Sequence, residues 1–159
     1  MIYATAGAKL YIGGAHSMKS ADHVEADFST ETWVEITGLE SLGSLGDSSS
    51  EITQAFIDSK RAKRIKGVRN AGSMEVICGI NYADDGQQAL IAAEKASDDY
   101  AFRIVFDDAP ANGTPSERMF IAAVGSAVEA YDAADTVMKL NASLWVNSNV
   151  VRVDAAAGV

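Results

Sequence analysis

The side chains best suited to catalysis or metal binding are few in this chain and follow no known pattern. His16 and His23 lie in a polar stretch near the N-terminus without a Cys/His cluster or an HExxH spacing, so we expect them to be exposed rather than metal ligands. The glycines of 43–46 (GSLG) lack the lysine and the serine or threonine of a phosphate-binding loop, and no GxSxG motif is present. The sequence therefore contains no recognisable active site.

Paired acids and a single cysteine are the remaining candidates for chemistry. The acid pairs at 84–85, 98–99 and 107–108 each lie beside the end of an expected element, where carboxylates cap helices and solubilise turns. Cys78 lies in an apolar alternating segment, so we expect a small buried hydrophobic residue rather than a reactive thiol. We predict that the protein is not an enzyme and holds no metal or cofactor.

The strongest chemical signal is a basic segment, residues 58–70, in an otherwise acidic protein. It has one acid, Asp58, against six cations, which gives a local charge of +5: Lys60, Arg61, Lys63, Arg64, Lys66 and Arg69. Because the whole chain carries −9, the remainder carries −14. This separation of charge predicts a binding arm whose partner is an acidic surface, and a second copy of the chain offers one. A solvated loop without a partner is the alternative.

Length and composition predict one domain over residues 1–159. A chain of this size buries enough surface to fold without disulfides, and a lone cysteine is typical of a reducing cytoplasm. The N-terminal residues do not read as a signal peptide, and no apolar run is long enough to cross a membrane. A pI of about 4.6 argues against nucleic-acid binding by the molecule as a whole, because phosphate binding depends on clustered cations.

Alternation of apolar and polar residues predicts six to eight strands. The segments that show it are 8–13, 33–39, 51–57, 73–81, 100–106, 118–130, 136–146 and 150–153. Gly125, in the middle of a long strand, predicts a bulge or bend. In 136–146, every second residue from Met138 to Val146 is expected to face one side.

One helix is predicted, over residues 83–97. Asp84 suits the N-cap, and Gln87 three residues later completes a capping box. Leu90 and Ala93 lie at helical spacing, and the many alanines predict a helix that lies close against its neighbour. Strands joined mostly by loops favour a mainly β (α+β) fold, namely an antiparallel β-sandwich or barrel with one packed α-helix and a long β-hairpin arm.

The order of these elements, together with several stretches of sequence, resembles the major tail tube proteins of long-tailed (siphovirus-type) bacteriophages. The ordered set is more specific than any one of its members, which are WVEITGL, Leu-Gly-Asp at 45–47, EITQAFI, the basic hairpin loop, SMEVICGINYADDGQQAL, YAFRIVFD, and RMFIAAVGSAVE with the strand after it. These stretches cover most of the chain, and the region before about residue 30 matches least well.

The resemblance implies a structural protein of the virion. Family members form six-fold rings that stack into a hollow conduit for DNA delivery from capsid to host, with four strands per subunit lining the inner barrel. The implied partners are copies of the chain itself in a homohexameric ring and in stacked rings, tail terminator and tail-tip proteins, and a tape measure protein in the lumen. Genomic DNA would pass through without specific binding. The implied location is the virion tail, after synthesis and assembly in the host cytoplasm.

The resemblance also assigns roles to particular residues. The loop that reaches the neighbouring ring corresponds to about 58–70, so its six cations are expected to contact acids of that ring. Glu51, Glu75 and Glu129 lie on predicted strands and are our candidates for lumen acids that repel DNA phosphates. If the alternation of a strand is shifted by one residue, its acid would lie on the opposite face of the sheet. Trp33 and Trp145 are expected in the core or between subunits.

Two other interpretations stay open from the sequence. A monomeric β-sandwich binding module, for example for carbohydrate, would have exposed aromatic residues at a groove, whereas most aromatic residues here lie in alternating strands. The tube protein of a contractile secretion system shares the fold, and sequence does not separate it from a phage tail tube. A chain that is monomeric at every concentration would favour the binding module.

Overall fold

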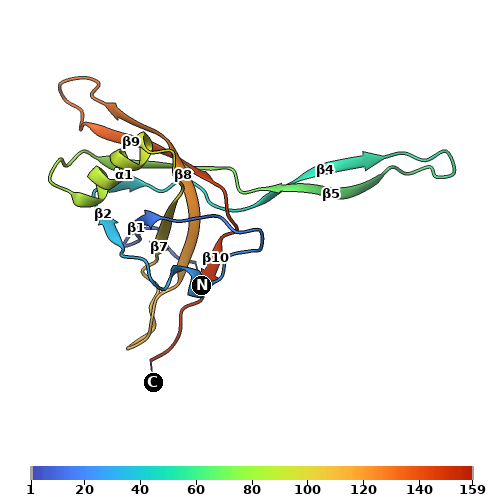
Figure 1. The fold of residues 1–159 in the computed structure, drawn as a ribbon, viewed down its shortest axis with the longest axis horizontal. Coiled ribbons are helices and arrows are strands. Elements are labelled where there is room, and N and C mark those ends of the chain that lie inside the picture. The colour runs from blue at the N-terminus through green and yellow to red at the C-terminus, as the bar shows by residue number, and fades with distance from the viewer. Residues whose placement is uncertain (1, 159) are drawn as a thin grey trace.

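A computed structural model describes residues 2–158, and it consists of a bent β-sheet body from which a two-stranded arm projects (Figure 1). The elements in chain order are β1 (Lys9–Ala15), the 3-10 helix η1 (Glu25–Phe28), β2 (Val34–Ile36), β3 (Leu39–Ser41), β4 (Ser48–Gln54), β5 (Lys63–Asn70), β6 (Ser73–Gly79), α1 (Asp85–Lys95), β7 (Tyr100–Val105), β8 (Glu117–Ala130), β9 (Lys139–Val146) and β10 (Val151–Val153). The prediction of a mainly β, antiparallel fold with one α-helix and a hairpin arm is confirmed. No helix in the described range is both long and apolar enough to cross a membrane.

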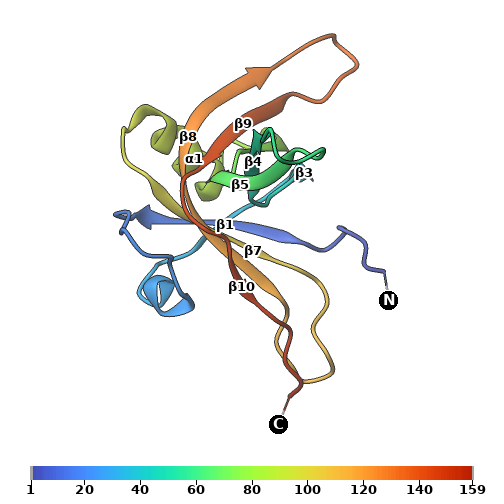
Figure 2. The ribbon, with the colours of Figure 1, turned by 90° about the vertical axis from the view of Figure 1, so that its right-hand side faces the viewer.

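The body is a single antiparallel sheet in the order β2-β1-β7-β8-β9-β6-β3, with β10 paired to β8. Strand β8 links the two halves of the sheet, because its first part pairs with β7 and its second part with β9. The register between β8 and β9 shifts between Val124 and Ser126, so the bulge predicted at Gly125 is confirmed. The sheet bends along β8 (Figure 2), and strands of both halves contribute to one apolar core.

Alternation along the strands decides which side chains enter this core. In β6, Met74, Val76 and Cys78 are buried. In β9 every second residue from Leu140 to Val146 is buried, as predicted, whereas Met138, predicted on the same face, lies before the strand and is 42% exposed. Cys78 is the small buried residue that the sequence indicated. Burial raises the pKa of its thiol to about 11, so the thiol stays protonated and unreactive near neutral pH.

Helix α1 covers one edge of the core and lies close to β2. A Cβ added at Gly86 would be 2.1 Å from the carbonyl oxygen of Glu35, so this contact requires glycine and the predicted close approach is confirmed. Asp84 is the N-cap, since its Oδ2 accepts a hydrogen bond from the Gln87 amide at 2.9 Å. The second half of the predicted capping box is wrong, because the Gln87 side chain turns inward instead.

The buried side chain of Gln87 joins three parts of the chain. Its Nε2 donates to the carbonyl oxygens of Thr37 and Gly79, each at 2.9 Å, and its Oε1 accepts from the Asn81 amide at 3.0 Å. Only 1% of Gln87 is exposed, so its side-chain amide depends on these protein partners for its hydrogen bonds. Gln87 therefore fixes the helix to the end of β6 and to the link between β2 and β3.

The strand predicted over residues 33–39 is two strands in the structure. β2 pairs with β1 and β3 pairs with β6, so the two lie at opposite edges of the sheet. Gly38 between them has φ +75°, a conformation that glycine adopts without strain. The Thr37 hydroxyl donates to Asp84 at 2.8 Å, which holds the link against the start of α1.

Candidate assembly surfaces

The arm, residues 48–70, is an antiparallel ribbon of β4 and β5 that belongs to no other sheet in the described chain. Figure 1 shows it extending away from the body. The sequence suggested that the basic segment is a loop. This is wrong, because four of its six cations (Lys63, Arg64, Lys66 and Arg69) lie in strand β5. Lys60 and Arg61 lie in the connection between the strands. Ile65 and Val68 are β-branched but three positions apart, which is not the alternation of a strand, so no local pattern indicated β5.

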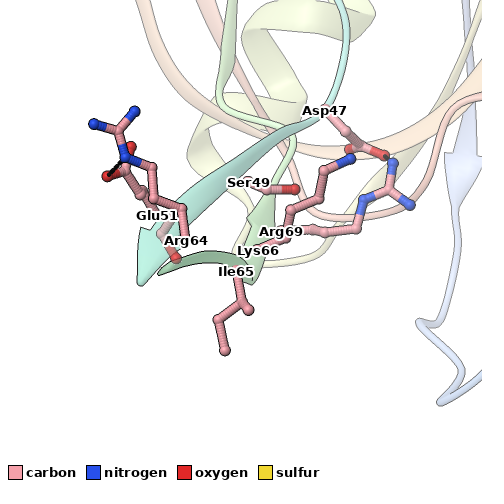
Figure 3. Close-up of a pocket in the computed structure, with 8 residues that line it drawn as sticks. Asp47, Ser49, Glu51, Arg64, Ile65, Lys66 and Arg69 are labelled. Carbon is pink, nitrogen blue, oxygen red and sulfur yellow. Dashed lines mark hydrogen bonds and ion pairs between the residues drawn. The ribbon is translucent and has the colours of Figure 1, made fainter. Parts of the chain in front are cut away.

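Two of the six cations are held by acids of the same chain (Figure 3). The Nη2 of Arg69 lies 2.7 Å from Oδ2 of Asp47 at the root of the arm, and the Nε of Arg64 lies 3.3 Å from Oε1 of Glu51. Within residues 2–158, Lys60, Arg61, Lys63 and Lys66 have no acid within 4.0 Å. Most of the positive charge of the arm is therefore available to a partner.

The arm also exposes apolar side chains that a solvated ribbon would not need. Ile52 and Ile65 are directly paired across the strands and are 50% and 64% exposed, so they form one apolar face. Phe56, Ile57 and Val68 are exposed as well. A two-stranded ribbon without further packing is marginally stable in water. This combination is typical of an element that becomes covered on assembly.

The structure places the three candidate lumen acids on three different surfaces. Glu51 is on the arm and pairs with Arg64. Glu75 is on the outer face of the sheet, where its Oε1 accepts a hydrogen bond from the Ser143 hydroxyl at 2.8 Å. Glu129 is opposite the buried Leu140, so it lies on the other face of the sheet. These three acids therefore do not line one surface of the chain, and the placement of any of them in a lumen stays a prediction.

The side of β6, β8 and β9 that faces away from the core is called here the outer face. Its side chains, small or polar for the most part, are Ser73, Glu75 and Ile77 of β6, Ser126 and Val128 of β8, and Lys139, Asn141, Ser143 and Trp145 of β9. Trp145 is 55% exposed and covers Gly125, so it is not a core residue; Trp33 is partly buried against Phe28. A role for Trp145 between subunits stays a prediction.

One edge of β8 has no strand beside it. Ala122 pairs with Tyr100 of β7 on one side and with Val146 of β9 on the other. Beyond Ala122, β9 continues along β8 while β7 does not, so residues 123–130 have an edge without a ladder partner in the described chain. Such an edge is able to pair with a strand of another copy.

Sequence reasoning missed an aromatic and acidic group at the end of the body. Glu129 accepts a hydrogen bond from the hydroxyl of Tyr131, and the hydroxyl of Tyr82 lies 3.5 Å from the same carboxylate oxygen. The carboxylate raises the pKa of the Tyr131 hydroxyl, because the hydrogen bond favours the protonated phenol. The two tyrosines come from separate loops, and the sequence alone does not bring them together.

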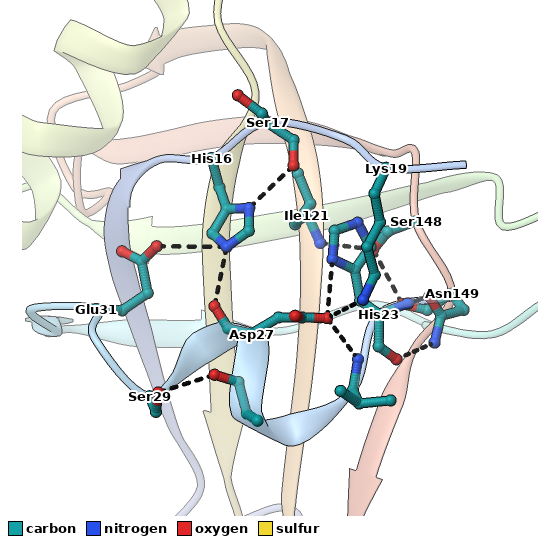
Figure 4. A network of polar contacts seen from close by, with 12 residues as sticks. His16, Ser17, Lys19, His23, Asp27, Ser29, Glu31, Ile121, Ser148 and Asn149 are labelled. Carbon is teal, nitrogen blue, oxygen red and sulfur yellow. Dashed lines mark hydrogen bonds and ion pairs between the residues drawn. The ribbon is translucent and has the colours of Figure 1, made fainter. Parts of the chain in front are cut away.

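The expectation that both histidines are exposed is wrong: His23 is 4% exposed, and the side chain of His16 is 20% exposed. The backbone of His23 is clamped by Asn149, whose Oδ1 accepts from the His23 amide at 2.7 Å and whose Nδ2 donates to the His23 carbonyl at 3.0 Å (Figure 4). The Asp27 carboxylate lies 3.5 Å from Nδ1 of His23 and also binds Lys19 at 2.6 Å. The cluster therefore fastens the segment after β1 to the segment before β10.

The pKa values of the two histidines are shifted in opposite directions. Burial lowers the pKa of His23, whereas a hydrogen bond to the Asp27 carbonyl raises the pKa of His16. No group of three or more His, Cys, Asp or Glu side chains in residues 2–158 is arranged to hold a metal ion. The contacts of both histidines are with their own chain, and they indicate a structural attachment.

Comparison with known proteins gives likeness in structure only. No family model matches the sequence, and no curated protein matches it. A chain of the anti-feeding prophage (AFP) baseplate superposes with a TM-score of 0.69 at 10% identity, covering 97% of this chain and 97% of that one. A chain of the sheath/tube terminator of the PVC extracellular contractile injection system gives a TM-score of 0.68 at 11% identity, covering 96% and 97%.

The tail tube of SPP1 is also similar, with a TM-score of 0.58 at 17% identity over 92% of this chain and 76% of that one. At such identities the likeness establishes the fold. The chain thus has the fold found in these tail tube and injection-system structures.

Proposed function

We propose that this chain is the repeating subunit of a bacteriophage tail tube, in which six copies close into a ring and the rings stack into a hollow conduit for DNA. The observation that carries this proposal is the arm, an exposed hairpin with unpaired cations and apolar side chains, on a body with a tail tube fold. Head-to-tail contacts of identical copies build rings and stacks of this kind.

The ring would form through the edges of the sheet. The free edge at residues 123–130 of β8 offers backbone donors and acceptors to a neighbouring subunit, and pairing in the ring leaves no exposed ladder groups there. The strands β8, β9, β6 and β3 of each subunit would then continue around the ring as an inner barrel. Closure by rotation makes the ring finite, whereas stacking along the axis stays open.

The outer face of β6, β8 and β9 would line the lumen. Glu75 is its one acid, and Lys139 is neutralised by Glu40 of β3 at 2.9 Å. Small and polar side chains with a weak negative charge neither bind phosphates nor obstruct a polyanion. DNA and a tape measure protein would pass through this space without specific contacts, while terminator and tail-tip proteins would meet the two ends of the stack.

A structural role also accounts for the chemistry that the chain lacks. The titratable side chains with shifted pKa values are engaged with their own chain, as Asp27 is with Lys19 and Val24. We therefore propose that the protein has no catalytic activity and that its place is the virion tail. The tube of a contractile injection system is the second candidate, because the AFP and PVC chains superpose over nearly their whole length.

Negative-stain electron microscopy of the purified protein over a concentration series tests the proposed function. Rings or hollow tubes of uniform width are expected, with the fraction of assembled protein rising with concentration. Analytical ultracentrifugation of the same samples provides an independent measure of mass. A protein that stays monomeric at every concentration and sediments as a single small species would contradict the proposal and favour a monomeric binding module.

A further inference from the structure

The end of the body away from the arm has an acidic and apolar surface. We define the far-end patch as residues 82–85 together with residues 129–138, two segments that meet where Tyr82 approaches Glu129 at 3.5 Å. Figure 1 shows that helix α1, which follows the first segment, and the loop between β8 and β9 both lie opposite the arm. The patch contains five acids and no lysine or arginine.

Apolar side chains are exposed among these acids. Tyr82, Tyr131 and Val137 are 60%, 56% and 69% exposed, and Met138 is 42% exposed. The hydroxyls of Tyr82 and Tyr131 both contact Glu129, which brings the two segments together, and Val137 and Met138 follow in the same connection between β8 and β9. Exposed apolar side chains grouped among acids in this way are typical of a contact surface.

The arm has the complementary properties. Residues 48–70 hold six cations and two acids, so the arm carries +4 against −5 for the far-end patch. Its apolar face of Ile52 and Ile65 would cover the exposed side chains of the patch while its unpaired lysines approach the acids. The arm of the same chain cannot cover the far-end patch, because it points away from the patch (Figure 1).

We infer that the far-end patch is the docking surface for the arm of a second copy of this chain in the next ring. This inference rests on the proposed function and adds to it the acids that the arm contacts, namely Glu129, Asp132 and Asp135 with the N-terminal turn of α1. The occupant must be basic and partly apolar, and the arm is the segment of the described chain that has both properties. Nucleic acid is excluded as the occupant by the sign of the charge.

A crosslinking experiment with paired cysteines tests this contact directly. Ile65→Cys on the arm is combined with Val137→Cys on the patch, both at exposed positions, and assembled protein is treated with a short bis-maleimide. The native Cys78 stays silent, because it is buried and its thiol pKa is about 11. The matched control combines Ile65→Cys with Ala109→Cys in the exposed loop between β7 and β8.

The expected result is a ladder of covalent multimers longer than dimers for the Ile65→Cys/Val137→Cys protein, and no such ladder for the control. Tubes that form normally but give no ladder, or the same ladder in both proteins, would overturn the docking inference and leave the proposed function standing. Wild-type protein that never assembles would remove the proposed function and the inference together.

Discussion

The guanidinium of Arg69 lies 2.7 Å from the carboxylate of Asp47, so strand β5 is joined by an ion pair to the residue directly before strand β4. The ion pair spans the root of the arm, where the arm leaves the body. Because exposed ion pairs contribute little to folding, we expect this one to act mainly on the direction of the arm.

Breaking this pair should separate assembly from stability. We expect Asp47→Asn to change the free energy of unfolding by less than about 1 kcal/mol, since Arg69 is largely exposed, while the concentration needed for tube formation rises several-fold. Urea unfolding and sedimentation measure the two quantities. Glu40→Gln, which removes the similarly exposed pair with Lys139 in the body, is the control for stability. An unchanged assembly threshold would argue against a role in setting the direction of the arm.

Removing the charge of the arm should prevent stacking without unfolding the subunit. In Lys63→Gln/Arg64→Gln/Lys66→Gln, the body is intact because these side chains are exposed and contact no core residue. We expect folded protein by circular dichroism and no tubes by electron microscopy, and tube growth of the wild type should weaken with added salt. Three neutralised cations elsewhere, Lys9, Lys95 and Arg152, serve as the control. Normal tubes from the arm variant would refute the charge-based contact.

Gln87 should be among the most sensitive polar residues of the body. Truncation in Gln87→Ala removes a buried side chain and its three hydrogen bonds, with the carbonyls of Thr37 and Gly79 and the amide of Asn81. We expect a loss of about 2–4 kcal/mol in the free energy of unfolding. Chemical denaturation compared with Gln88→Ala, its exposed neighbour, measures the difference. Equal effects of the two substitutions would show that the buried bonds contribute nothing.

Gly125 should tolerate no side chain while Trp145 covers it. An added Cβ would lie 2.2 to 2.6 Å from three indole atoms, so Gly125→Val must displace the ring or shift the bulge. We expect a loss of about 1–3 kcal/mol and a change in tryptophan fluorescence. Trp145→Ala in the same background should recover much of the loss, which a double-mutant cycle quantifies. Gly46→Val, at an open position, is the control.

The histidine cluster should make stability depend on pH. The pKa of His23 in the folded state is below its value in the unfolded state, so the unfolded state binds the proton better and stability falls as the pH drops below about 6.5. His16 has a raised pKa and acts in the opposite sense, adding stability below about 6.5 that is lost as the pH rises.

Thermal unfolding between about pH 7 and pH 5 separates these two contributions. We expect His23→Asn to reduce the loss of stability at acid pH and His16→Asn to increase it. The pKa of Asp27 is lowered by its contact with Lys19, so its carboxylate stays ionised over this range. Parallel pH profiles for the wild type and His23→Asn would show that the buried imidazole is not the group responsible.

Local patterns in the sequence predicted most of the body. The alternation in β6 and β9, the N-cap at Asp84 and the bulge at Gly125 each depend on residues that are neighbours in the chain. The features that sequence reasoning missed depend on distant partners. His23 is buried because Asn149, 126 positions away, binds its backbone, and no local pattern carries that information.

The candidate site was predicted in composition but not in geometry. The six cations of the arm stood out by charge, yet strand β5 did not, because lysine and arginine in an exposed ribbon weaken the usual apolar signal. The face on which Glu129 lies follows from the bulge at Gly125, which shifts the register of β8 by one residue. A single inserted residue was enough to place Glu75 and Glu129 on opposite faces.

The opposed positions of the arm and the far-end patch give any stack of these subunits a chemical polarity. At one end of the filament the basic arms of the last ring would be free, and at the other end the acidic far-end patches would be uncovered. Subunits would add to the two termini at different rates, because the incoming copy contributes a different surface in each case. A protein that caps one terminus would have to imitate the patch, and a protein that caps the other would have to imitate the hairpin.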